Sequence, residues 1–155
     1  MTDDSIPAGD RYRDRYEGFP DGFFTRRDEG DDSRFYGEPR AVYHIDDGAI
    51  AAVRDLYDEL SLYGEVLDLC SSWVSHLART PKRLVALGMN ADELEGNEQA
   101  HEWVVHDLNR EPALPFADAS FDGAMCTVSV DYLTRPLEVF DEVARVLRPG
   151  APFVC

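Results

Sequence analysis

The residues with the clearest chemical potential follow a short apolar run, where Val66-Leu67-Asp68-Leu69 leads into Cys70-Ser71-Ser72-Trp73. An acid at the end of a buried-strand pattern is typical of sites that grip a nucleotide-type cofactor, because ligands of α/β sheets bind at the carboxyl ends of the strands. Loops at such sites usually contain glycines that let the backbone approach the ligand, and this loop has none. The sequence therefore predicts a cofactor site at this loop, where the missing glycines either obstruct the pocket or change the shape of the loop.

Cysteine and histidine side chains of the sequence suggest two other kinds of site, a thiol nucleophile and a metal centre. Cys70 and His76 fit a thiol nucleophile with its base, but a small buried thiol at a strand end is the commoner alternative. His101 and His106 are also ligand types, yet no compact set of four side chains has the spacing of a zinc site. We expect no metal, and no general base is evident.

Two helices are predicted from apolar residues at spacings of three and four. Asp46 or Asp47 can cap the first, and Pro136 begins the second, which Pro149-Gly150 ends. The side chains expected to face the core are Ile50, Val53, Tyr57 and Leu60 in the first helix, and Leu137, Phe140, Val143, Ala144 and Leu147 in the second.

Short apolar runs at 66–69, 84–87, 103–105, 124–130 and 153–155 are the expected strands. Trp73 is expected to open a helix after the first strand, and the acids at 92, 93 and 95 to form a solvated helix face. Near-continuous apolar strands separated by helices indicate an α/β fold, with a mainly parallel sheet covered on both faces.

Residues 1–39 mix acidic, basic and aromatic residues without a helical or strand period, which predicts a loop-rich or disordered N-terminal arm before a domain at 40–155. The aromatic side chains of the arm either form a surface strap or cover a cofactor pocket. They are Tyr12, Tyr16, Phe19, Phe23, Phe24, Phe35 and Tyr36.

The charge is strongly negative, with 31 Asp and Glu residues against 15 Lys and Arg residues and a formal net charge of -16. Such a chain repels itself unless salt shortens the Debye length, to roughly 3 Å at 1 M. We therefore expect a halophilic protein, with an acidic mesophilic protein as the alternative. Nucleic acid is not an expected partner, because phosphates require clustered basic side chains.

Cysteine usage and the absence of targeting signals bear on the compartment. Cys70, Cys126 and Cys155 are odd in number and widely spaced, which favours reduced thiols. The acidic N-terminus lacks a secretory signal, and no apolar stretch approaches the roughly 20 residues of a membrane span. We expect a cytoplasmic protein that does not contact membranes.

Three blocks together resemble a class I S-adenosylmethionine-dependent methyltransferase domain over residues 35–155. The first is 66–73 and the second is 84–94. The third, which is the specific one, joins Asp107, Leu114-Pro115-Phe116 and Ser120-Phe121-Asp122 to the helix end Arg148-Pro149-Gly150. The resemblance implies a Rossmann-like, doubly wound sheet with strand order 3-2-1-4-5 and S-adenosyl-L-methionine as cofactor.

The resemblance also implies roles for single residues. Asp68 and the loop of Cys70, Ser71 and Ser72 would lie near the methionine end of the cofactor, Gly88 and Met89 near the ribose, and Asp107 and Leu108 at the adenine. Thr127 would face the reactive side of the cofactor. Ser129, Asp131 and Tyr132 would face the substrate.

The chain departs from the family pattern in three places. Cys70, Ser72 and Val74 replace the three glycines of the first motif, and Gly88 replaces the acid that holds the ribose. A buried hydroxyl without a partner costs about 1 to 3 kcal/mol, or one to two orders of magnitude in affinity. The sequence also stops at Cys155, before the final hairpin of the family, which leaves a sheet edge that invites self-association or a partner.

Two functions follow from these observations. One is methyl transfer to a small or medium-sized acceptor that the sequence does not identify. The other is a non-catalytic binding or interaction module that kept the sheet. Use of NAD is less favoured, because its glycine fingerprint is also missing.

Overall fold

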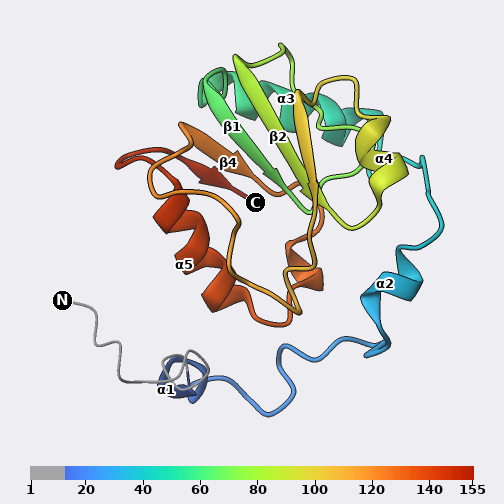
Figure 1. Cartoon of the computed structure of the whole chain (residues 1–155), viewed down its shortest axis with the longest axis vertical. Helices are drawn as coiled ribbons and strands as arrows, with labels where there is room; N and C mark the ends of the chain where they lie inside the picture. The colour runs from blue at the N-terminus through green and yellow to red at the C-terminus, as the bar shows by residue number, and fades with distance from the viewer. Residues whose placement is uncertain (1–12) are drawn as a thin grey trace.

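Five short strands form one parallel sheet in the computed structural model, which describes residues 13–155 (Figure 1). The strand order is β3-β2-β1-β4-β5, as predicted. Parallel pairing places the carboxyl ends of the strands along one edge. The strands are β1 (Glu65–Leu69), β2 (Arg83–Gly88), β3 (Glu102–Val105), β4 (Gly123–Met125) and β5 (Phe153–Val154).

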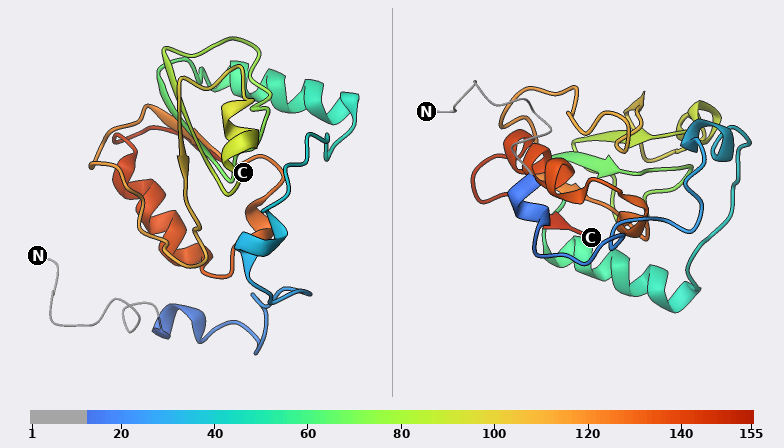
Figure 2. Two further views of the ribbon diagram at one scale, coloured as in Figure 1. Left: turned by 45° about the vertical axis from the view of Figure 1, so that its right-hand side comes forward. Right: turned by 90° about the horizontal axis from the view of Figure 1, so that it is seen from below.

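Alternate side chains of the strands enter two hydrophobic clusters, one on each face of the sheet. Val66 packs with Tyr57 of α3 (Asp47–Glu59), which lies along one face (Figure 2). Leu67 and Leu69 pack with Val139 and Val143 of α5 (Pro136–Val146) on the other face. The remaining helices are short: α1 (Arg13–Tyr16), α2 (Asp32–Phe35), α4 (Ala91–Glu95) and the 3-10 turn η1 (Val130–Tyr132).

The caps and buried faces of the two longer helices differ in detail from the sequence prediction. Asp46 caps α3 as expected, because its side chain accepts a hydrogen bond from the amide of Ala49. Leu60 is 39% exposed, so the predicted face of this helix does not extend to its end. In α5 the predicted Ala144 is exposed, and Val146 is buried instead.

Two predicted elements are wrong. No helix follows β1: residues 70–82 form an irregular loop, so Trp73 does not open a helix. The fourth strand is much shorter than 124–130, because it ends at Met125. Beyond it, Val128 has a φ of 61°, which is incompatible with an extended strand.

The segment from α1 to Asp46 crosses the side of the molecule where the strands end (Figure 1). Near its start, Arg15 forms an ion pair of 2.6 Å with Asp141 of α5. The rings of Tyr16, Phe19, Phe23 and Phe24 pack against one another. Tyr12 and the acidic residues at the N-terminus lie outside the described residues.

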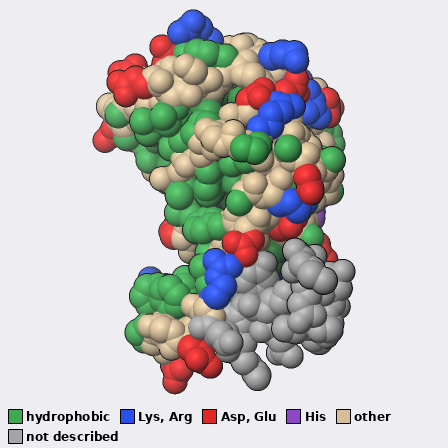
Figure 3. Space-filling view, turned by 90° about the vertical axis from the view of Figure 1, so that its left-hand side faces the viewer, with side chains coloured by type: hydrophobic (Ala, Val, Ile, Leu, Met, Phe, Trp, Pro, Cys, Tyr) green, Lys and Arg blue, Asp and Glu red, His purple; other side chains and the backbone are tan. Residues whose placement is uncertain are grey.

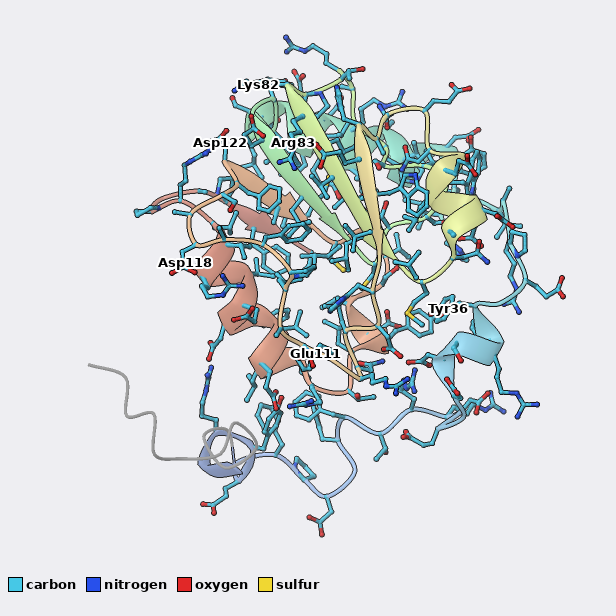
Figure 4. All side chains as sticks on the ribbon, viewed as in Figure 1. Tyr36, Lys82, Arg83, Glu111, Asp118 and Asp122 are labelled. Atoms are coloured by element: carbon cyan, nitrogen blue, oxygen red, sulfur yellow. The ribbon has the colours of Figure 1, made fainter. Side chains whose placement is uncertain are left out.

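The opposite edge of the sheet, where the strands begin, carries ion pairs. Lys82 and Arg83 pair with Glu65, and Arg83 also pairs with Glu102 (Figure 4). Charges of both signs flank a strip of hydrophobic side chains on the face viewed from the side of β4 and β5 (Figure 3). Among residues 13–155, no helix has the length and apolar character that crossing a membrane requires.

Candidate functional site

A cavity of about 420 Å³ lies at the carboxyl ends of β1 to β4, with the segment from Arg26 to Ile45 as its outer wall. This volume is within the usual range for small-molecule sites. The structure brings all the predicted site residues into the lining of this one cavity. They are Asp68, Cys70, Ser71, Ser72, Gly88, Met89, Asp107, Leu108, Thr127, Ser129, Asp131 and Tyr132.

Asp68 is the buried carboxyl group of the site, with only 2% of the residue exposed. Its Oδ2 accepts hydrogen bonds of 2.6 Å from the hydroxyls of Ser71 and Ser75. Asn97 donates to the Ser75 hydroxyl at 2.8 Å and to the Ser72 carbonyl at 3.0 Å. Burial raises the pKa of Asp68 to about 7, against the lowering effect of the two serines. A buried polar network therefore fixes the loop after β1.

The loop keeps one backbone feature of a glycine-containing turn. Cys70 has a φ of 52°, in the left-handed region that glycine adopts without steric cost. The next residue turns across the end of β2, where the amide of Ser71 donates to the Leu87 carbonyl at 2.8 Å. A Cβ on Gly88 would overlap the carbonyl oxygen of Ser71. The backbone of the loop after β1 lies where a side chain at position 88 would be, so this position requires glycine.

Glu93 is a site residue that the sequence prediction missed. It is not part of a solvated face: it is half-buried and lines the cavity. Its carboxylate accepts hydrogen bonds of 2.6 Å from the Ser72 hydroxyl and from the amide of Arg40. The sequence feature that could have identified Glu93 is its position three residues after Asn90. Asn90 caps α4, because its side chain accepts a hydrogen bond of 3.1 Å from the Glu93 amide. Glu93 is the one carboxylate that the β2–α4 segment brings into the lining.

Asp107 follows β3 and organises its own turn. Its Oδ1 accepts from the amides of Asn109 at 3.0 Å and Arg110 at 3.2 Å. The adjacent Leu108 is 5% exposed and joins the core below the cavity. The Asp107 carboxyl group is therefore held next to the apolar side chain of Leu108. This arrangement suits a flat ring that carries one polar group.

Thr127 lies beyond the end of β4. Its Oγ1 is 2.5 Å from the hydroxyl of Tyr57, which is 3% exposed on α3. Burial is the main cause that raises the pKa of Tyr57, to about 12. The next residue, Val128, is 46% exposed and holds a positive φ of 61° that a β-branched residue rarely adopts. Strained backbone therefore lines the cavity at the end of β4.

The arm contributes residues that no periodic pattern could have identified. Asn90 Nδ2 donates to the Tyr36 carbonyl at 2.7 Å, and Asn109 Nδ2 donates to Asp32 at 3.0 Å. Figure 4 shows Tyr36 between α2 and the ends of the strands. Burial raises the pKa of Tyr36 to about 12, and the nearby Tyr132 hydroxyl adds to this effect. Of the arm's aromatic residues, Phe35 and Tyr36 line the cavity.

The nucleophile alternative is not supported by the hydrogen bonds of the thiols. Cys70 and His76 both line the cavity, but no hydrogen bond joins them within the described chain. The Cys70 thiol instead interacts with buried Cys126, and this hydrogen bond is the main cause that raises the pKa of Cys126. Within residues 13–155, no three ligand-type side chains gather as a metal site would require.

The charges of the lining favour a cationic ligand. Five carboxylates, of Asp32, Glu38, Glu93, Asp107 and Asp131, face two guanidinium groups, of Arg26 and Arg40, and Asp68 adds a carboxyl group whose pKa burial raises to about 7. A sulfonium nucleoside such as S-adenosylmethionine carries a net positive charge, whereas a dinucleotide such as NAD carries phosphates. The lining therefore fits the first and disfavours the second.

Comparison with known families identifies the family of this chain. A family model described as a methyltransferase domain matches residues 69–155, more than half of the chain. The chain belongs to the methyltransferase domain family. Its strand order is that of the Rossmann-like class I fold, and the family uses S-adenosyl-L-methionine as its cofactor.

Two curated relatives are 40% identical to parts of this methyltransferase domain. One is the biotin biosynthesis bifunctional protein BioHC of Teredinibacter turnerae, over 62 residues that make up 40% of this chain and 10% of that protein. The other is the ubiquinone/menaquinone biosynthesis C-methyltransferase UbiE of Roseobacter denitrificans, over 88 residues, 57% of this chain and 30% of that protein. The match thus spans less than a third of each relative.

Two solved structures share the fold at 20% identity. The [4+2]-cyclase SpnF aligns with a TM-score of 0.55 over 79% of this chain and 54% of that chain. A chain in the complex between the Haloferax volcanii Trm112 methyltransferase activator and its assigned methyltransferase aligns with a TM-score of 0.50, over 69% of this chain and 55% of that chain. At this identity the likeness concerns the fold alone.

Proposed function

We propose that this methyltransferase domain transfers the methyl group of S-adenosylmethionine to a small or medium-sized acceptor at the cavity of about 420 Å³. The observation that supports the proposal is the convergence of Asp68, Asp107 and Thr127 on one acid-rich cavity at the strand ends. When bound, the cofactor supplies an electrophilic methyl carbon on a sulfonium sulfur. Alignment of donor and acceptor then supplies much of the rate, and no metal is needed.

We infer that the residues of the chain divide the cofactor between them as the family resemblance implies. Asp107 accepts from the adenine amino group, and its Oδ2 remains available because Oδ1 caps the turn. Glu93 accepts from the ribose hydroxyls in place of the acid absent at Gly88. Asp68 and the loop at 70–72 hold the methionine end, and Thr127, kept in position by Tyr57, faces the reactive side.

Calorimetric titration with S-adenosylhomocysteine in molar potassium chloride tests these roles. The wild-type chain should bind. Glu93→Gln should weaken binding about tenfold, because a neutral acceptor replaces a charged one. Asp107→Asn should weaken it similarly, since the variant keeps the turn cap but presents a donor to the adenine amino group. Glu95→Gln is the matched control, because Glu95 is exposed on the same helix and does not line the cavity.

A second candidate is a binding module without catalysis. It is favoured by the position of the Ser71 carbonyl against Gly88, where the ribose acid of the family would stand. Under this alternative neither S-adenosylmethionine nor S-adenosylhomocysteine binds to the wild-type chain. The absence of binding in both titrations would overturn the methyltransferase proposal and favour the binding module.

A further inference from the structure

Arg26 carries an unsatisfied donor inside the protein. Among the side-chain nitrogen and oxygen atoms that are buried in residues 13–155, only its Nε has no hydrogen-bond partner. Its side chain is 16% exposed, and its Nη1 forms an ion pair of 2.5 Å with Asp32. Buried polar groups nearly always have partners, so an orphaned donor in a cavity wall indicates a place for a ligand acceptor atom.

Arg26 stands between two cavities. A second cavity, of about 300 Å³, lies between the segment 25–36 and η1. It shares with the first cavity the side chains of Arg26, Asp32, Phe35, Tyr36, Asp131 and Tyr132. None of the residues from the ends of β1, β2 and β3 lines the second cavity. It is therefore adjacent to the proposed cofactor site but formed by different elements.

Half of the six residues in the shared wall are aromatic. Phe35 and Tyr132 are 45% and 46% exposed. The Arg40 guanidinium lies over the Phe35 ring at 4.3 Å, so the ring surface available to a ligand is that of Tyr132 and the remainder of Phe35. Tyr36 lines the same wall and lies between α2 and the strand ends (Figure 4). Aromatic rings stack on flat partners in offset or edge-to-face geometry, which favours a planar apolar body.

The charges of the second cavity limit the ligand further. Four carboxylates, of Asp28, Asp31, Asp32 and Asp131, outnumber the guanidinium groups of Arg26 and Arg27. This balance repels phosphates and other anions. A ligand without an acceptor atom would leave the Arg26 Nε unsatisfied. An uncharged ring that bears an oxygen atom meets both conditions and, unlike a cation, brings no positive charge beside the guanidinium groups of Arg26 and Arg27.

We propose that the second cavity is the subsite for the methyl acceptor, and that it takes a small uncharged aromatic molecule whose oxygen accepts a hydrogen bond from Arg26 Nε. The proposal rests on the proposed methyltransferase function. It places the acceptor beside Asp131 and Tyr132, which follow β4 and line both cavities.

Titration of p-cresol into the full chain saturated with S-adenosylhomocysteine, in molar potassium chloride, tests this subsite. The wild-type chain should bind p-cresol at millimolar concentration. Toluene, which lacks the oxygen, and p-tolyl phosphate, which is anionic, should bind at least tenfold more weakly. Arg26→Lys keeps a positive charge beside Asp32 but lacks the guanidinium group and its Nε donor. The p-cresol affinity of this variant should therefore fall about tenfold. Because Arg26 also lines the first cavity, S-adenosylhomocysteine affinity is measured for the same variant and should fall much less than p-cresol affinity.

Arg34→Lys is the matched control, because Arg34 lies on α2 and lines neither cavity. Equal p-cresol binding by wild type and Arg26→Lys would overturn the proposal, as would the absence of p-cresol binding to a chain that binds S-adenosylhomocysteine. If Arg26→Lys weakens S-adenosylhomocysteine binding as much as p-cresol binding, the Nε donor serves the cofactor and the acceptor assignment is wrong. A wild-type chain that binds no S-adenosylhomocysteine would instead contradict the underlying methyltransferase function.

Discussion

Asp68 shows how one buried carboxyl group can both order a loop and carry a pH dependence. Its two serine partners, Ser71 and Ser75, hold the loop that follows β1. Desolvation nevertheless dominates, and the pKa of Asp68 rises from 3.8 to about 7. The folded protein therefore retains a proton that the unfolded chain releases from about pH 4 upward.

This proton predicts that the free energy of unfolding falls as pH rises from about 4 to about 7, because the native state binds more protons in that window. Asp68→Asn imitates the protonated acid and should remove this decline, so the variant should gain on wild type as the pH increases and then level off. Urea unfolding of both proteins at several pH values measures the difference. The comparison cancels His76, whose pKa is lowered mainly by burial. If the free energies of unfolding of the two proteins change in parallel with pH, the raised pKa of Asp68 is contradicted.

At the scale of elements, strands with strong apolar patterns were predictable and the segments between them were not. The runs at 66–69 and 84–87 fall within β1 and β2, because strands buried on both faces need apolar side chains throughout. The helix expected from Trp73 is absent, since serine side chains bond locally and to Asn97 instead of leaving the backbone to helical pairing. Trp73 donates its indole N–H to the Val42 carbonyl at 3.2 Å.

The candidate site could be located from sequence only on the side that the sheet supplies. Strand ends are fixed by the apolar pattern, so Asp68, Asp107 and Thr127 were identifiable as neighbours in space. The arm has no period, and its position depends on single long-range bonds such as that of Asn109 to Asp32. For this reason Arg26 could not be placed before the structure was known.

The crossing of the β1–β2 loop over the end of β2 leads to a prediction for Gly88. Gly88→Ala would push a methyl group into the Ser71 carbonyl, which must shift, and should reduce stability by about 1 to 3 kcal/mol as well as weaken S-adenosylhomocysteine binding. Gly96→Ala is the control. Its added Cβ would meet backbone carbonyls at 3.4 Å, and its φ of -74° is ordinary, so stability should change by less than about 0.5 kcal/mol. Equal effects in urea unfolding would contradict this account of the loop.

Over the whole molecule, the 15 Lys and Arg residues can pair with only part of the 31 Asp and Glu residues, which leaves the formal net charge of -16. Several ion pairs have exposed partners, such as Arg79 with Asp58, whose side chains are 65% and 41% exposed. Pairs of this kind contribute little to stability. Self-repulsion of the excess carboxylates therefore acts against the compact state, and screening should relieve it.

We predict that the free energy of unfolding in urea rises steeply as potassium chloride increases from about 0.05 M to about 1 M, where the Debye length falls from above 10 Å to roughly 3 Å. Urea is the appropriate denaturant because it is uncharged and leaves the ionic strength unchanged. A rise that is complete by about 0.3 M would indicate simple screening, whereas a continuing rise at molar salt would indicate adaptation to high salt through excluded ions and stronger apolar burial. A series with potassium sulfate at matched ionic strength separates these two causes, because sulfate strengthens the burial of apolar surface more than chloride does. Undiminished cooperative folding at the lowest salt would show that the acidic surface is only a solvated face.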